Sequence, residues 1–124
     1  MRGHILLVEP EQTASRHLAA VLAQAEFAVM TAASGPEALR LAYREPPDLI
    51  ILELRLPGMD GIETLRQFHG RGITAKVMIH TAHGTPRHAR EARALGAREF
   101  LGKPFDAHRL LRLIAEEVGE RVAR

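Results

Sequence analysis

DLIILELRLPGMDG, residues 48–61, decides the fold that we expect for this chain. Its apolar run at 49–52 is short and rich in β-branched side chains, which is typical of a strand buried on both faces of a sheet. The run ends at Glu53, and the Pro-Gly and Asp-Gly pairs within residues 57–61 predict a loop. A single carboxylate at the carboxyl end of a central strand lies where open α/β sheets bind their ligands.

Four further apolar runs predict strands, and amphipathic segments between them predict helices. The expected strands are 5–8, 27–32, 49–53, 76–80 and 98–101. Five helices are expected. The first runs from Pro10, at a first helical position, to residue 25, and the second from the cap at Ser34 to the prolines at 46–47. The third covers 62–69, the fourth runs from the cap at Thr85 to residue 95, and the fifth starts at Asp106. Strict alternation predicts one domain over 1–124, an α/β three-layer sandwich with a five-stranded parallel sheet and helices on both faces.

The composition excludes several classes of protein. Of the 124 residues 46% are hydrophobic and 26% charged, there is no cysteine, and the net charge is only +2. We therefore expect no nucleic-acid binding by this domain, no disulfide and no thiolate metal site. No apolar run approaches the length of a membrane span, so we expect no membrane association, and the chain fits the cytoplasm.

Polar residues follow four of the predicted strands at their carboxyl ends. They are Glu9-Pro10, Glu53, Thr81 and Lys103-Pro104. In a parallel sheet these ends converge on one shallow pocket. An acid, a hydroxyl and an ammonium meeting there indicate phosphoryl chemistry, with a carboxylate as acceptor and a positive charge to neutralise the phosphate.

The chain resembles a response-regulator receiver domain (CheY-like) of bacterial two-component signalling, over essentially all of its length. The stretches that carry the resemblance are ILLVE, DLIILELRLPGMDGIE, TAHG and ALGAREFLGKPF, in that order. The resemblance implies a flavodoxin-like fold with strand order 2-1-3-4-5. It also implies a non-enzymatic module that accepts a phosphoryl group from a histidine kinase in a phosphorelay.

The resemblance assigns roles to individual positions. Glu53 occupies the place of the phospho-accepting aspartate, and Glu9-Pro10 the place of the acidic pair that binds Mg²⁺ together with the backbone carbonyl of Arg55. Thr81 matches the hydroxyl that moves toward the phosphoryl group, and Phe100 the aromatic switch position. Lys103 matches the lysine that pairs with the phosphoryl group, and the Lys103–Pro104 bond would be cis.

Two of these positions depart from the family pattern. Pro10 offers no side-chain oxygen to a metal, and Glu53 is one methylene longer than aspartate. We therefore predict no phosphorylation by the ordinary route and weak or absent Mg²⁺ binding, with Glu9, Glu53 and the Arg55 carbonyl as residual ligands, and we expect no other cofactor. Glu53 is expected to pair with Lys103, either imitating a phosphorylated aspartate or merely filling an abandoned site. A working phospho-receiver with an unusual acceptor is the alternative.

Arg87, Arg90 and Arg93 recur every three residues along the helix expected after Thr85. The resemblance places this helix, with the fifth strand and fifth helix, on the usual docking surface. The hypothesis is a contact with a protein partner, such as a histidine kinase or an output domain, by a monomer or weak dimer. The alternative is a solvated face relieved by Glu91.

Other functions lack their motifs. The seven histidines include His80, His83 and His88, but no thiolate completes a zinc site, so surface histidines are the favoured interpretation. The glycine-free loop EPEQTAS argues against flavin, and no Walker, dinucleotide-binding or nucleophile-elbow motif occurs. An interaction module that uses the receiver fold without switching remains the main competitor.

Overall fold

The apolar run that ends at Glu53 forms the central strand of a parallel sheet in the computed structural model, which describes residues 2–104 and 106–119. The strands are β1 (His4–Val8), β2 (Ala28–Ala32), β3 (Leu49–Glu53), β4 (Lys76–Thr81) and β5 (Glu99–Gly102). The helices are α1 (Gln12–Gln24), α2 (Gly35–Arg44), α3 (Gly61–Gly70), α4 (Pro86–Ala94) and α5 (Ala107–Ile114), and a π-helical turn η1 (Ala115–Gly119) follows α5. Phe105, within the ALGAREFLGKPF stretch, lies outside the described residues.

The strand order is β2-β1-β3-β4-β5, and every neighbouring pair is parallel. All five residues of β3 are buried, as expected for a strand covered on both faces. In the register of the sheet, Leu52 lies opposite Val8 on one side and Ile79 on the other, and Glu53 lies opposite His80. The predicted three-layer sandwich and its strand order are confirmed.

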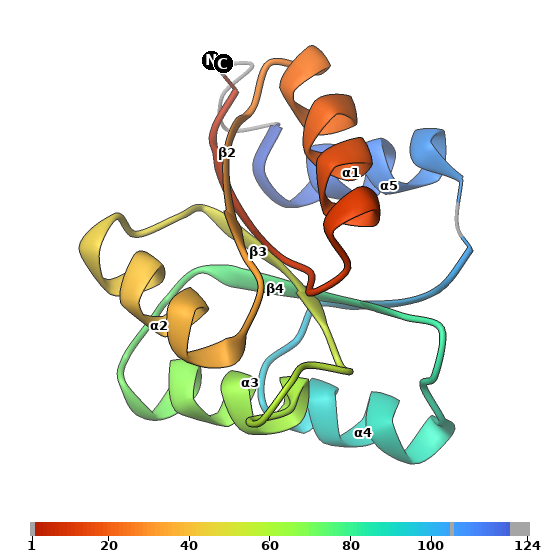
Figure 1. Cartoon of the computed structure of the whole chain (residues 1–124). Helices are drawn as coiled ribbons and strands as arrows, with labels where there is room; N and C mark the ends of the chain where they lie inside the picture. Colours follow the sequence, from red (N-terminus) through yellow and green to blue (C-terminus); the bar gives the residue numbers. More distant parts are fainter. Residues whose placement is uncertain (1, 105, 120–124) are drawn as a thin grey trace.

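Helices cover both faces of this sheet. Figure 1 shows α1 and α5 on one face and α2, α3 and α4 on the other. Because side chains alternate along a strand, each strand supplies both cores: Leu49 and Ile51 pack with the α1/α5 side, whereas Ile50 and Leu52 pack with the α2/α3/α4 side. The same alternation directs Glu53, two residues after Ile51, toward the α1/α5 face.

The predicted caps at Ser34 and Thr85 are confirmed, because each side chain accepts a hydrogen bond from a backbone N–H in the first turn of its helix. Asp106 lies at the start of the last helix as predicted, and its side chain caps α5 by accepting from His108 N. The prediction that Pro10 begins the first helix is wrong. The carboxylate of Glu9 accepts the N–H of Glu11 at 3.0 Å, which turns the chain at Pro10. Glu11 is then the cap, with its side chain accepting from Ala14 N at 2.7 Å, and α1 begins at Gln12.

A glycine allows α3 to begin directly against the end of β3. The N–H of Gly61 donates to the carbonyl of Leu54 at 2.8 Å. A Cβ at this position would lie 2.4 Å from the carbonyl oxygen of Glu53 and 2.6 Å from the Cα of Leu54. Both neighbours are backbone atoms, so the start of α3 and the tip of β3 would have to move apart to admit any side chain.

We expect Gly61→Ala to lower the free energy of unfolding by about 1–3 kcal/mol, the usual range for overpacking. The matched control is Gly70→Ala in the same helix, where a Cβ meets nothing within 4 Å; there alanine should stabilise by roughly 0.5–1 kcal/mol through its higher helix propensity. Urea denaturation of both variants provides the measurement. Equal stability of the two variants would show that the close approach at Gly61 has no energetic weight.

Candidate functional site

Three side chains from distant parts of the sequence meet at the carboxyl edge of the sheet. Lys103 Nζ donates to Glu9 Oε1 at 2.6 Å and to Glu53 Oε1 at 2.7 Å. The two glutamates are only 4% and 5% exposed. The expected contact between Glu53 and Lys103 is present, and Glu9 joins it as a second carboxylate. We refer to these three side chains as the acid–lysine cluster.

The remaining carboxylate oxygens bind backbone N–H groups. Glu9 Oε2 accepts from Glu11 N at 3.0 Å, and Glu53 Oε2 accepts from Arg55 N at 3.1 Å. All four oxygens of the cluster therefore have a donor within the chain. The Lys103–Pro104 peptide bond that follows β5 is cis.

The cluster sets the charge of its members. Burial alone would raise the pKa of Glu53, but hydrogen bonds from Lys103, Thr81 and the Arg55 N–H outweigh burial and lower that pKa. Burial alone would lower the pKa of Lys103, but hydrogen bonds to Glu53 and Glu9 raise it. Glu53 and Lys103 are therefore held as an ion pair at neutral pH.

A buried histidine borders the cluster. His80 is 1% exposed, and its Nε2 lies 3.9 Å from Glu9 Oε1. Burial, together with the charge of Lys103, lowers the pKa of His80 to about 4, although Glu9, Glu53 and the backbone of Val8 favour the protonated form. The imidazole is therefore neutral at pH 7. The interpretation of the histidines as surface residues is wrong for His80, because it is buried within β4, opposite Glu53.

Thr81 and Phe100 lie close to each other beside the cluster. Thr81 is 1% exposed, and its Oγ1 accepts from His83 N at 3.1 Å. Phe100 is half-buried and packs against the core on the α2/α3/α4 side. Gly84 makes this arrangement possible, since a Cβ there would lie 2.5 Å from Phe100 Cζ and 2.9 Å from Thr81 Cγ2.

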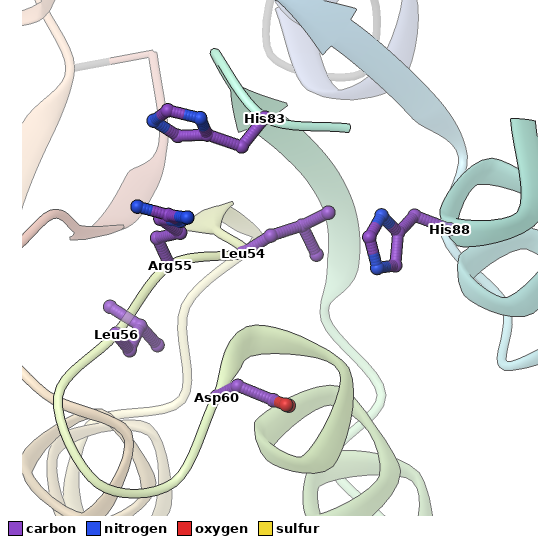
Figure 2. A pocket seen from close by; sticks show the side chains of 6 residues that line it. All are labelled: Leu54, Arg55, Leu56, Asp60, His83 and His88. Carbon is purple, nitrogen blue, oxygen red and sulfur yellow. The ribbon is translucent and has the colours of Figure 1, made fainter. Parts of the chain in front are cut away.

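A hollow of about 490 Å³ opens between the β3–α3 and β4–α4 loops. Figure 2 shows Arg55 and His83 on one side of it, His88 on the other, and Leu54 between them. Asp60, the N-cap of α3, also lines it. No sequence pattern predicts this hollow, because its lining comes from the β3–α3 loop, the β4–α4 loop and the first turn of α4, whose approach depends on the tertiary fold.

The residues at the Mg²⁺ position of the family do not fit that ion. Mg²⁺ requires near-octahedral oxygen coordination. Pro10 supplies no side-chain oxygen, and the oxygens of Glu9 and Glu53 already accept from Lys103 or from the backbone. Over residues 2–104 and 106–119, no three His, Asp or Glu side chains converge on a point that could hold a metal.

The three arginines of α4 lie apart from the cluster. Arg87, Arg90 and Arg93 are all exposed, and Arg87 Nε lies 4.0 Å from Glu91 Oε1. This weak ion pair is what the alternative interpretation requires, namely a solvated face whose positive charge is partly neutralised by Glu91.

In the part of the chain that the structure describes, no helix is both long and apolar enough to cross a membrane.

A parallel sheet of this strand order, with a carboxylate, a hydroxyl and a lysine at its carboxyl edge, defines the class of receiver-type signalling modules. A family model described as the response regulator receiver domain matches residues 5–115, and the chain belongs to this family. The family predicted from the sequence is confirmed. Receiver domains are signalling modules that interact with kinases and output domains.

Known relatives support this assignment. The chain is 35% identical over 106 residues to sporulation initiation phosphotransferase F of Bacillus subtilis (strain 168), covering 86% of each protein. It is 32% identical over 117 residues to the DNA-binding transcriptional regulator NtrC of Escherichia coli (strain K12), covering 94% of this chain but only 25% of NtrC. The crystal structure of Vibrio cholerae chemotaxis protein CheY4 matches with a TM-score of 0.88 at 27% identity, over 95% of this chain and 100% of CheY4.

Proposed function

We propose that this receiver domain, acting as one unit over residues 1–124, signals through protein contacts without phosphorylation of Glu53 and without bound Mg²⁺. The observation that carries the proposal is the position of Lys103 Nζ, which lies 2.6 Å from Glu9 Oε1 and 2.7 Å from Glu53 Oε1. The acceptor carboxylate is thereby engaged by the lysine that would otherwise neutralise an incoming phosphoryl group.

The chemistry of phosphoryl transfer supports the proposal. An in-line transfer needs a carboxylate oxygen placed against the phosphorus and a cation that neutralises the phosphoryl oxygens. Both oxygens of Glu53 already accept hydrogen bonds, from Lys103 and from Arg55 N. With Pro10 in place of an acid, nothing at that position would help to draw a metal into the site.

The Glu53–Lys103 contact resembles the contact that Lys103 would make with a phosphoryl group, although a carboxylate has fewer oxygens and less charge. We infer that this contact biases the domain toward one signalling state and that α4, β5 and α5, with Arg87, Arg90 and Arg93, form the contact surface for a kinase or an output domain. The alternative is an interaction module that does not switch. Such a module would contain the same contacts, and the two proposals differ only in whether the acid–lysine cluster controls the binding of a partner.

Intact-mass measurement after incubation with Mg²⁺ and a small acyl-phosphate donor tests the proposal. We expect the wild-type chain to remain unmodified. Glu53→Asp alone restores the acceptor but not the metal ligand, so modification should be slight. Glu53→Asp/Pro10→Asp restores both and should gain one phosphoryl group. The control, Glu53→Gln/Pro10→Asp, carries the metal ligand without an acceptor and should stay unmodified.

The decisive outcome is the behaviour of the wild-type chain. A phosphoryl group on wild-type Glu53 would identify a working phospho-receiver with a glutamate acceptor and would refute the proposal. A double variant that remains unmodified, while folded by circular dichroism, would show that the site differs from an ordinary receiver in more than these two residues.

A further inference from the structure

The exposed side of α2 carries an aromatic side chain that the core does not use. Tyr43 is 78% exposed, and among residues 2–104 and 106–119 no other large hydrophobic side chain is exposed. α2 packs through its opposite side, with Ala38, Leu39 and Ala42 buried, and lies beside α3 on the same face of the sheet (Figure 1). One exposed aromatic residue needs no explanation by itself. The side chains that surround Tyr43, however, suggest a binding surface.

Two hollows flank this tyrosine and share Tyr43 and Arg71 as wall residues. Their volumes are about 250 Å³ and about 340 Å³. Their other walls are mainly apolar: Pro46, Pro47 and Ile73 in the smaller hollow, and Pro36, Leu39 and Met59 in the larger one. They are small and open compared with cofactor pockets, but each could receive one aliphatic side chain.

The charged side chains around the hollows have one sign. Arg71 lines both hollows and Arg40 lines the larger one, whereas no described acidic residue lines either. Arg71 Nε donates to Gln67 Oε1 at 3.4 Å, and neither arginine forms an ion pair with any residue in the described ranges. A carboxylate that reached either guanidinium would gain a charge-assisted hydrogen bond without displacing an acid of this chain.

We propose that Tyr43, Arg40, Arg71 and the two hollows form a docking surface for an extended acidic segment of a partner protein. One apolar side chain of that segment occupies each hollow, on either side of Tyr43, and its carboxylates pair with Arg40 and Arg71. Tyrosine, arginine and methionine are the residue types enriched at such interfaces. A nucleic acid would require more cations than two and would leave the apolar hollows unused.

The two hollows of this Tyr43 surface share no lining residue with the arginines of α4 or with the acid–lysine cluster. The three central side chains of the Tyr43 surface are exposed, and their replacement should leave the fold intact. The surface can therefore be tested by substitution in the whole chain.

The probe is a short synthetic peptide with two leucines spaced among aspartate and glutamate residues, titrated into the ¹⁵N-labelled chain and followed by amide chemical shifts. We expect the shifts to change on α2 and on the α3–β4 loop. Tyr43→Ala, and separately Arg40→Glu/Arg71→Glu, should weaken binding at least tenfold, as loss of a central interface residue does. The control for charge reversal at a different surface is the triple variant Arg87→Glu/Arg90→Glu/Arg93→Glu. It should bind the acidic peptide with the affinity of the wild-type chain.

Two control peptides complete the experiment, one with lysines in place of the acids and one with serines in place of the leucines; both should bind at least tenfold more weakly. The proposal is wrong if the acidic peptide does not bind, if the lysine peptide binds equally well, or if the shifts change on α4 instead. The proposal is also wrong if the chemical shifts around Tyr43 change with protein concentration but not on addition of the peptide. That result would identify a second copy of the chain as the occupant.

Discussion

Replacing Lys103 by methionine is expected to lower the free energy of unfolding by about 3–5 kcal/mol, the range measured when one partner of a buried ion pair is removed. Methionine keeps most of the length of the side chain but leaves Glu9 and Glu53, 4% and 5% exposed, without their shared ammonium. The hydrogen bonds from Glu11 N to Glu9, and from Arg55 N and Thr81 to Glu53, would then remain to compensate two buried carboxylates. Denaturant unfolding at pH 7, followed by circular dichroism, measures the loss.

The only other lysine of the chain provides a matched control. Lys76 Nζ lies 3.6 Å from Glu117 Oε1 at a position where the lysine side chain is 35% exposed, so Lys76→Met should cost less than about 1 kcal/mol. In the background Glu9→Gln/Glu53→Gln, Lys103→Met should cost less than in the wild type, because no carboxylate is left uncompensated. If Lys103→Met is no more destabilising than Lys76→Met, the cluster does not bury its charges as the structure indicates.

The fold could be predicted from sequence because its signals are local. The uniformly apolar run at 49–52 and the turn that follows it indicate a central parallel strand without any long-range information. The caps at Ser34 and Thr85 likewise depend on a few neighbouring residues, and both were predicted correctly. The start of α1 was not, because the turn at Pro10 is held by the side chain of Glu9, which no local helix signal takes into account.

The site could be predicted only in outline. The positions of Glu9, Glu53, Thr81 and Lys103 at strand ends place them on one edge of the sheet, but the choice of partners depends on tertiary geometry. Lys103 binds both glutamates rather than Glu53 alone. The burial of His80 follows from its register opposite Glu53, which sets it inside the edge rather than on the loop. The Tyr43 surface combines α2, the α3–β4 loop and Met59 of the β3–α3 loop, and no sequence pattern connects these segments.

The burial of His80 predicts a second large effect, a loss of stability on acidification. The pKa of His80 falls from 6.5 to about 4 in the folded chain, through burial and the charge of Lys103. Between these two values the unfolded chain binds a proton that the folded chain does not, so stability decreases as the pH falls. The full shift corresponds to about 3 kcal/mol, and we expect a loss of this order between pH 7 and pH 4 in denaturant unfolding experiments.

The variant His80→Leu should remove this dependence between about pH 6.5 and pH 4.5, whereas His83→Leu, at an exposed position on the loop that follows β4, should retain it. The lowered pKa of Glu53 also destabilises the folded chain in acid, but only as the pH falls below the ordinary carboxyl value of 4.5. The upper part of the pH range therefore reports on His80 separately from Glu53. Imidazole NMR signals of the wild-type chain give an independent measurement, because His80 should stay neutral until about pH 4. A His80 that titrates near 6.5, together with an unchanged pH slope in His80→Leu, would mean that the imidazole is hydrated rather than enclosed beside Glu9.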